Sequence, residues 1–165
     1  FGDWFEGFMP KYTDRVVYDK GHTWFFIGPE NTLSELHADH DDVHTTIQQI
    51  TGLKHFFMIK PEELEILKSN YSKKEISSIR FKVVDNKEFS LSAIKSMFTK
   101  KAIYEIKPRL AILESKDILY LPSRWGHYAQ SLRPSISVSR DFIDDRNIDS
   151  YFCSRMINFK RNNKE

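Results

Sequence analysis

Three residues of this 165-residue chain have the types and spacing of a metal-ligand set. His37 and Asp39 form a His-x-Asp pair at the end of an expected strand, and His127 follows much later. In an extended strand, residues i and i+2 project to the same face, so His37 and Asp39 can contact one ion. Two imidazoles and one carboxylate on one face of an octahedral ion leave three positions open, which suits Fe(II) that activates O2. We therefore predict a catalytic metal at His37, Asp39 and His127.

The sequence alone leaves alternative roles open for these histidines. His40 and Asp42 form a second His-x-Asp pair three residues further on, and His127 could be a core histidine bonded to the backbone. We interpret His40 and His44 as residues of a cavity rim or loop. His22 and His55 have no partner pattern, so a structural role is the simplest interpretation for them.

The segments that must position these residues are mostly short and rich in β-branched and aromatic side chains, as strands are. The strands that we expect are Thr23–Ile27, Thr45–Gln49, Lys54–Ile59, Ala102–Ile106, Arg109–Glu114, Asp117–Leu121, His127–Leu132 and Ser135–Phe142. The pattern has no parallel βαβ rhythm and no internal repeat. It predicts a mainly β chain with an antiparallel barrel or jelly-roll core and a few helices added outside.

Two short helices are expected beside this core. Pro61–Lys68 begins with proline and acids and ends with lysine, and Leu91–Phe98 has apolar residues at helical spacing. We predict a single domain over residues 1–165, with residues 69–101 inserted as a decoration of the core. Because the chain opens with Phe1 instead of Met, we expect further residues before it in the translated product.

Particular faces and side chains can also be assigned. The run Thr23–Ile27 is wholly apolar after its threonine and reads as a buried strand. In the last strand, Ser135, Ser137, Ser139 and Asp141 share one face, and a polar face toward a barrel interior is what a ligand cavity needs. Cys153 is the only cysteine, so an internal disulfide is excluded, and we read it as a buried small hydrophobe.

Composition and charge restrict the partners. The chain carries 25 basic and 23 acidic residues, a net charge of +2, which argues against nucleic acid as a partner. No apolar run is long enough to span a bilayer, and the N-terminus lacks a secretory signal pattern. We therefore expect no membrane association and a cytoplasmic location. The oligomeric state is undetermined, and a homodimer remains an alternative.

Three segments, in order along the chain, resemble the Jumonji C, or cupin-like, family of Fe(II)- and 2-oxoglutarate-dependent oxygenases. They are Gly28–Asp39 with its His-Ala-Asp ending, Gln49–Lys54 with its Gln-x-x-Gly-x-Lys pattern, and Asp117–His127 with its Tyr-Leu-Pro-x-x-Trp-x-His ending. The nine-residue step from Gly28 to His37 matches the family and favours His37 over His40 as the first ligand. The resemblance implies a double-stranded β-helix core.

The resemblance also implies roles for residues around the metal. Lys54 is expected to contact the far carboxylate of 2-oxoglutarate, since a lysine inside a barrel needs an anionic partner. Ser34, Thr45 or Thr46 would contact the cosubstrate, and Ser139 stands where many relatives have asparagine. Arg140 is a rival for the carboxylate, but its face is shared with Ile136 and Val138, which argues against it.

The implied activity is hydroxylation of a C–H bond with O2, in which 2-oxoglutarate becomes succinate and CO2. The compact, charge-balanced chain favours a small amino-acid-like molecule or a protein side chain as the substrate. Two alternatives remain: a cupin metalloenzyme that does not use 2-oxoglutarate, and an inactive barrel that serves as a binding or scaffold module.

Overall fold

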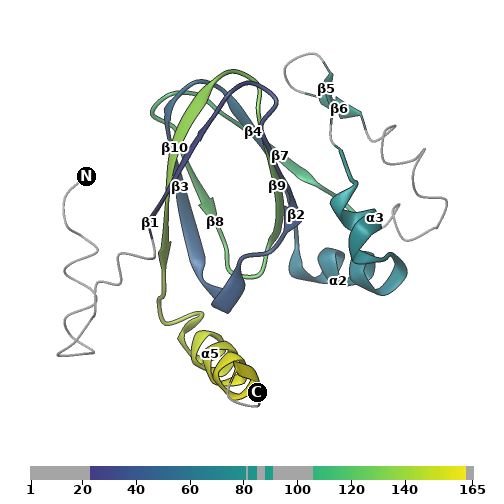
Figure 1. The fold of residues 1–165 in the computed structure, drawn as a ribbon, viewed down its shortest axis with the longest axis vertical. Helices are drawn as coiled ribbons and strands as arrows, with labels where there is room; N and C mark the ends of the chain where they lie inside the picture. Colours follow the sequence, from purple (N-terminus) through teal and green to yellow (C-terminus); the bar gives the residue numbers. More distant parts are fainter. Residues whose placement is uncertain (1–22, 81, 85–87, 91–105, 163–165) are drawn as a thin grey trace.

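Two antiparallel sheets face each other and enclose the interior of a barrel (Figure 1). The computed structural model describes residues 23–80, 82–84, 88–90 and 106–162. Sheet A has the order β1-β10-β3-β8, with strands at Thr23–Gly28, Ser135–Phe142, His44–Thr51 and Ile118–Leu121. Sheet B has the order β2-β9-β4-β7, with strands at Leu33–His37, Gly126–Ser131, Lys54–Ile59 and Arg109–Leu113. This arrangement confirms the predicted mainly β, jelly-roll class.

The alternation along β10 shows why sheet A can line a polar interior. Ser135, Ser137 and Ser139 are buried, whereas Arg140 between the last serine and Asp141 is exposed. Because successive side chains of a strand point to opposite faces, the serines turn toward the barrel interior and Arg140 turns away from it. The polar inner face expected from the sequence is therefore present.

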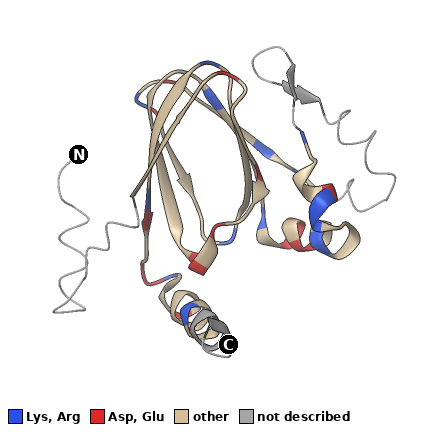
Figure 2. Cartoon of the chain, in the orientation of Figure 1, with Lys and Arg blue, Asp and Glu red and all other residues tan. Residues whose placement is uncertain are grey.

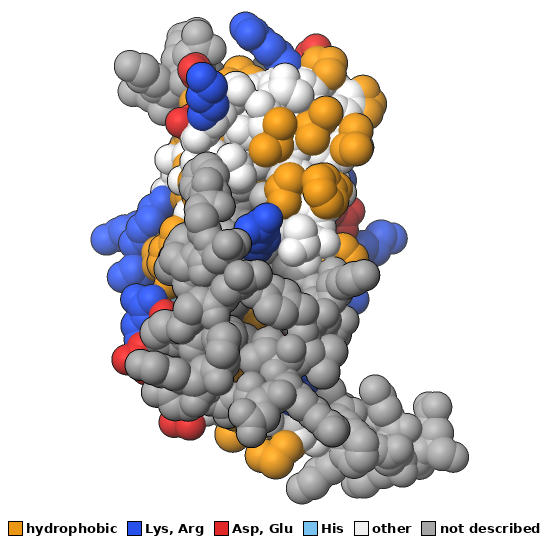
Figure 3. Space-filling model, turned by 90° about the vertical axis from the view of Figure 1, so that its left-hand side faces the viewer, with side chains coloured by type: hydrophobic (Ala, Val, Ile, Leu, Met, Phe, Trp, Pro, Cys, Tyr) orange, Lys and Arg blue, Asp and Glu red, His pale blue; other side chains and the backbone are white. Residues whose placement is uncertain are grey.

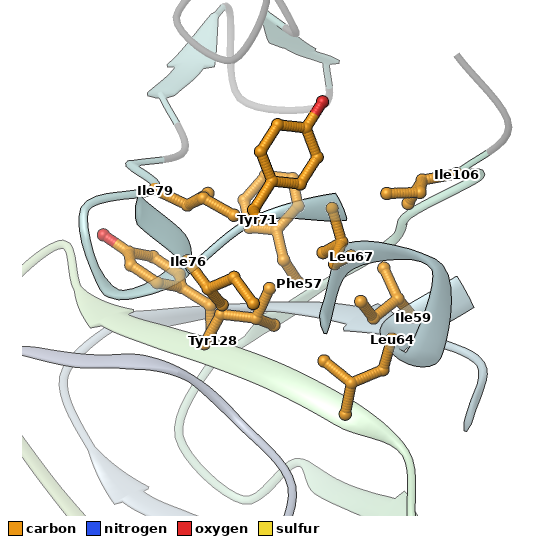
Figure 4. Packing of buried hydrophobic residues seen from close by; sticks show 10 residues of the cluster. Phe57, Ile59, Leu64, Leu67, Tyr71, Ile76, Ile79, Ile106 and Tyr128 are labelled. Carbon is orange, nitrogen blue, oxygen red and sulfur yellow. The ribbon is translucent and has the colours of Figure 1, made fainter. Parts of the chain in front are cut away.

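The main apolar core lies outside the barrel, between sheet B and two helices (Figure 4). The helices are α2, at Pro61–Asn70, and α3, at Lys73–Ser77. Figure 4 shows side chains of both helices packed with Phe57, Ile59 and Tyr128 of the sheet. The predicted helix at Pro61–Lys68 is confirmed. The helix α3 was not predicted, although Ser72 and Glu75 form the capping box that marks a helix start.

Two predictions of burial are wrong. The strand β1 forms as expected, but Phe25 and Ile27 on its outer face are 69% and 74% exposed. These residues belong to an apolar outer face of sheet A that also includes Ile50, Ile118 and Tyr120, and Figure 3 shows hydrophobic side chains gathered on this side of the molecule. An apolar run is compatible with either a buried or an edge strand, and β1 is at the sheet edge. Cys153 is likewise exposed, on helix α5.

Several elements lie beyond what the sequence predicted. A C-terminal helix, α5 at Ile148–Asn162, packs against the short 3-10 helix η2 at His40–Asp42. Strands β5, Lys82–Val84, and β6, Glu88–Ser90, pair with each other. The predicted helix Leu91–Phe98 and all of the predicted strand Ala102–Ile106 except its last residue lie outside the described residues.

Residues of both charge signs are distributed over the described elements (Figure 2). Acidic side chains occur on η2, whereas α3 carries both basic and acidic side chains. None of the helices described here is both long and apolar enough to cross a bilayer.

His55 is a buried histidine that makes folding sensitive to acid. It is 1% exposed, packs edge-on against Phe57 with ring centroids 5.4 Å apart, and neither ring nitrogen has a hydrogen-bond partner among the described residues. Burial lowers the pKa of His55 from 6.5 to about 4. The folded protein therefore binds fewer protons than the unfolded chain between these values, and its stability falls as the pH drops from 6.5 toward 4.

We expect His55 to account for a loss of about 3 kcal/mol in the free energy of unfolding across this range. In the His55→Phe variant, this part of the loss should disappear, because phenylalanine cannot take up a proton. Urea unfolding of both proteins at several pH values between 4 and 6.5 measures the difference. His40→Ala, which removes an exposed histidine, should leave the acid sensitivity unchanged. Equal acid sensitivity in wild type and His55→Phe would refute the assignment.

Candidate metal centre

The three predicted ligands come together at one end of the barrel. The ligand atoms of His37, Asp39 and His127 all lie within 4.8 Å of one another, although His127 is far away in the sequence. Strand pairing explains this, because His37 of β2 lies directly opposite His127 of β9 in the register of sheet B. The two imidazole rings are 4.2 Å apart between centroids. Asp39 has extended backbone dihedrals, which return its side chain to the face of His37.

Both imidazoles are oriented by backbone carbonyls, which fixes the nitrogen that faces the site. His37 Nδ1 lies 2.6 Å from the carbonyl oxygen of Glu35, and His127 Nδ1 lies 3.4 Å from that of Trp125. A carbonyl can only accept, so each Nδ1 carries the hydrogen and each Nε2 keeps a free lone pair. Both Nε2 atoms are 3.7 Å from the same oxygen of Asp39. This donor set, with its outer hydrogen bonds, fits a divalent transition metal.

The protonation state of His127 also fits a metal ligand. The residue is 6% exposed, and burial lowers its pKa to about 4; Asp39 opposes this shift and nearby His37 adds to it. The imidazole is therefore neutral near pH 7, as ligation requires. The His37 side chain is 48% exposed, so one side of the site is open to a substrate.

Thr45 lies within hydrogen-bond distance of the carboxylate of Asp39. Its hydroxyl lies 3.1 Å from Asp39 Oδ2 and 2.9 Å from Asp141 Oδ1, so it can donate to either carboxylate. The other oxygen of Asp39, Oδ1, is then left to face the two histidines. Thr46, the alternative to Thr45 in the sequence prediction, does not line the cavity, because the next residue along a strand points to the opposite face.

A cavity of about 510 Å³ extends from the three ligands into the barrel. Its volume lies within the range that is usual for small-molecule sites. Among the predicted site residues, Ser34, Thr45, Lys54 and Ser139 line it together with His37, Asp39 and His127. The rival Arg140 is exposed on the outer face of sheet A and does not contribute to the lining.

Lys54 places a positive charge inside this cavity. The residue is 8% exposed, and its Nζ donates to the hydroxyl of Ser137 at 2.9 Å. Burial lowers the pKa of Lys54, and within the described parts of the chain no carboxylate forms an ion pair with it. A buried ammonium without a counter-ion is costly, so this end of the cavity favours an anionic ligand.

Some residues of the cavity were not identified by any sequence pattern. Arg155 reaches its mouth from the unpredicted helix α5, where its Nε is 3.2 Å from Asp41 Oδ2. Trp24 and Phe26 of β1 also line the cavity, although the apolar run that contains them pointed only to a strand. Ile148, Tyr151 and Phe152 have helical spacing, but this repeat is too short to predict α5.

The two other histidines of the loop after Asp39 have different positions. His40 lines the cavity, as a rim residue would, but it is not part of the three-ligand group. His44 is buried outside the cavity lining, where its Nδ1 accepts from the backbone N–H of Ser123 at 3.0 Å. This bond ties β3 to the loop that leads into β9 and His127.

Comparison with known proteins agrees with this geometry. The family model for the cupin-like domain matches residues 7–145. Over 121 residues, or 72% of its length, the chain is 32% identical to "Lysine-specific demethylase JMJ30" of Arabidopsis thaliana. The chain belongs to the JmjC cupin-like family. This JmjC domain is also 28% identical over 116 residues, 69% of its length, to "Jumonji C domain-containing protein 5" of Drosophila melanogaster.

A further relative has a name that states its cofactors. The JmjC domain is 21% identical over 154 residues, 92% of its length, to "2-oxoglutarate and iron-dependent oxygenase JMJD4" of Gallus gallus. The matches cover 24%, 26% and 32% of the Arabidopsis, Drosophila and Gallus proteins, so the chain spans about a quarter to a third of their length. These relatives indicate a family of the iron- and 2-oxoglutarate-dependent oxygenase type.

Proposed function

We propose that this JmjC domain is an Fe(II)- and 2-oxoglutarate-dependent oxygenase that hydroxylates a C–H bond. The proposal is carried by one observation: the same cavity is lined by the His37, Asp39 and His127 group and by Lys54, whose ammonium forms no ion pair with any residue that the structure describes. The two histidines and the aspartate can bind the metal, and the ammonium can bind an anion at a distance from it. A 2-oxo dicarboxylic acid has a 2-oxo acid group for the metal and a second carboxylate for the ammonium.

Each wall of the cavity has a proposed role. His37, Asp39 and His127 would hold Fe(II), and the ammonium of Lys54 would donate to the far carboxylate of 2-oxoglutarate. With O2, the bound Fe(II) and 2-oxoglutarate would supply the oxidising chemistry that hydroxylates the substrate and releases succinate and CO2. Ser34 and Ser139 add hydroxyl groups to the lining, and Ile47, Phe56 and Ala129 add apolar surface that keeps water out.

The substrate would approach on the exposed side of His37. A second hollow of about 930 Å³ adjoins His37 and Asp39 and runs between β2 and helices α2 and α3. Leu64, Tyr71 and Ile76 give it an apolar floor, and Glu65 and Lys68 contribute charges of both signs. Such a lining suits an amino-acid-like molecule or a protein side chain, which carries charged and apolar parts together.

The proposal is tested by succinate release from 2-oxoglutarate in air with Fe(II). We expect slow succinate formation even without the true substrate and none above background with the His37→Ala variant. Because uncoupled turnover is slow, calorimetric binding of 2-oxoglutarate to the Mn(II)-loaded protein provides a second measurement. Metal binding without any 2-oxoglutarate binding would favour a cupin that uses other substrates. Failure of the anaerobically purified protein to bind Fe(II) would favour a scaffold.

A further inference from the structure

We propose that Ser137 and Gln49 are positioning residues that hold the ammonium of Lys54 at the far end of the cavity. By fixing this charge, they set how tightly the cavity binds a 2-oxo dicarboxylate and which chain length it prefers. The effect on dicarboxylate binding rests on the proposed function. The positioning of Lys54 does not, and it can be tested without any ligand.

The register of sheet A brings the two residues together. Ser137 of β10 lies directly opposite Phe26 of β1 on one side and opposite Gln49 of β3 on the other. An irregularity between Ile136 and Ser137 shifts the register, so that Gln49 and not Ile50 is the partner of Ser137. Lys54 belongs to β4 of sheet B, so its side chain must cross the interior to meet Ser137.

Lys54, Ser137 and Gln49 form a chain of hydrogen bonds in which each residue donates to the next. Lys54 Nζ donates to Ser137 Oγ at 2.9 Å, and Ser137 Oγ donates to Gln49 Oε1 at 2.7 Å. The amide of Gln49 in turn donates to the carbonyl oxygen of Thr51 at 2.7 Å. Since the single hydroxyl hydrogen of Ser137 is committed to Gln49, a lone pair of its oxygen is left to face the ammonium. Ser137 and Gln49 are both 0% exposed.

This anchor orients the charge without neutralising it. Lys54 Nζ meets a hydroxyl oxygen and, at 5.6 Å, the ring of Phe26, and neither carries a formal charge. A carboxylate in the place of Ser137 would compete with an anionic ligand for the ammonium. With a neutral anchor, the remaining N–H groups of Lys54 keep their full attraction for a carboxylate in the cavity. The distance from that ammonium to the metal ligands then selects the length of the dicarboxylate.

Ser135 provides a matched control on the same strand. It lies two residues before Ser137 on the same face of β10 and is 3% exposed. Its hydroxyl faces the carbonyl oxygens of Leu53 and Arg133, at 3.2 and 2.7 Å, and is not bonded to Lys54. Ser135→Ala therefore removes an equally buried hydroxyl without releasing the ammonium.

The first experiment measures Lys54 itself in the full chain without metal or ligand. An amine-labelling reagent followed by peptide mass spectrometry reports the reactivity of each lysine. We expect Ser137→Ala to raise the labelling rate of Lys54 by at least about threefold, because loss of the bond frees the amine and disfavours its charged form. Ser135→Ala should leave the rate unchanged. If Ser137→Ala does not fold, Gln49→Met replaces it, with the same expectation.

The second experiment measures binding of 2-oxoglutarate and of the one-carbon-longer 2-oxoadipate to the Mn(II)-loaded proteins. We expect Ser137→Ala to bind 2-oxoglutarate about tenfold more weakly and to distinguish the two acids less well than the unmodified chain. Unchanged affinity and discrimination, or an equal loss in Ser135→Ala, would overturn the proposal. If the unmodified chain binds neither acid, the proposed function fails, and the labelling rates alone decide whether Ser137 holds Lys54.

Discussion

His37→Ala should bind Fe(II) at least roughly a thousandfold more weakly than the unmodified chain and should form no succinate above background. Loss of an outer hydrogen bond to a metal ligand already costs about 10 to 100-fold in affinity, so loss of a ligand itself costs more. His37 and His127 face each other with both Nε2 atoms 3.7 Å from Asp39 Oδ1, so alanine at position 37 leaves only two donors. Anaerobic titration with Fe(II), followed by competition with a chelator, measures the affinity.

His40→Ala is the control for this prediction. His40 is a histidine of the same loop and lines the same cavity, but its ligand atoms do not belong to the three-residue group. The variant should keep the Fe(II) affinity of the unmodified chain. A loss of metal in His40→Ala with retention in His37→Ala would instead assign the site to the second His-x-Asp pair, His40 and Asp42.

Lys54→Met should weaken binding of 2-oxoglutarate to the Mn(II)-loaded protein by roughly a thousandfold and leave Mn(II) affinity unchanged. Removal of one partner of a buried ion pair costs about 3 to 5 kcal/mol, because the other charge then stays buried and unpaired. Methionine keeps much of the volume of the lysine stem, so the cavity wall should persist. Calorimetry with the metal alone and then with 2-oxoglutarate separates the two affinities.

Lys107→Met serves as the control, because Lys107 is an exposed lysine outside the cavity lining. This variant should bind both Mn(II) and 2-oxoglutarate as the unmodified chain does. If Lys54→Met keeps its affinity for 2-oxoglutarate, the ammonium has no part in binding the cosubstrate. A metalloenzyme that consumes other substrates would then be the better interpretation of the cavity.

Much of the fold was accessible from the sequence, for local reasons. The strands at Lys54–Ile59 and Ser135–Phe142 have the predicted bounds, because turn residues border them and their alternation of side chains is clear. The helix α5 was missed, because its apolar residues form no strong repeat and several, such as Phe152 and Met156, are exposed. The prediction that β1 is buried was wrong, because an apolar run does not reveal which neighbours a strand will have.

Local sequence patterns were sufficient to identify the side chains that are available for chemistry and those that share a strand face. His37 with Asp39, and the serines of β10, follow from the period of two in extended backbone. Three long-range contacts could be seen in the folded chain alone. His127 lies opposite His37, Lys54 reaches Ser137 across the barrel, and Arg155 lies at the mouth of the cavity. These contacts depend on the pairing and register of strands and helices distant in the chain, which no local pattern specifies.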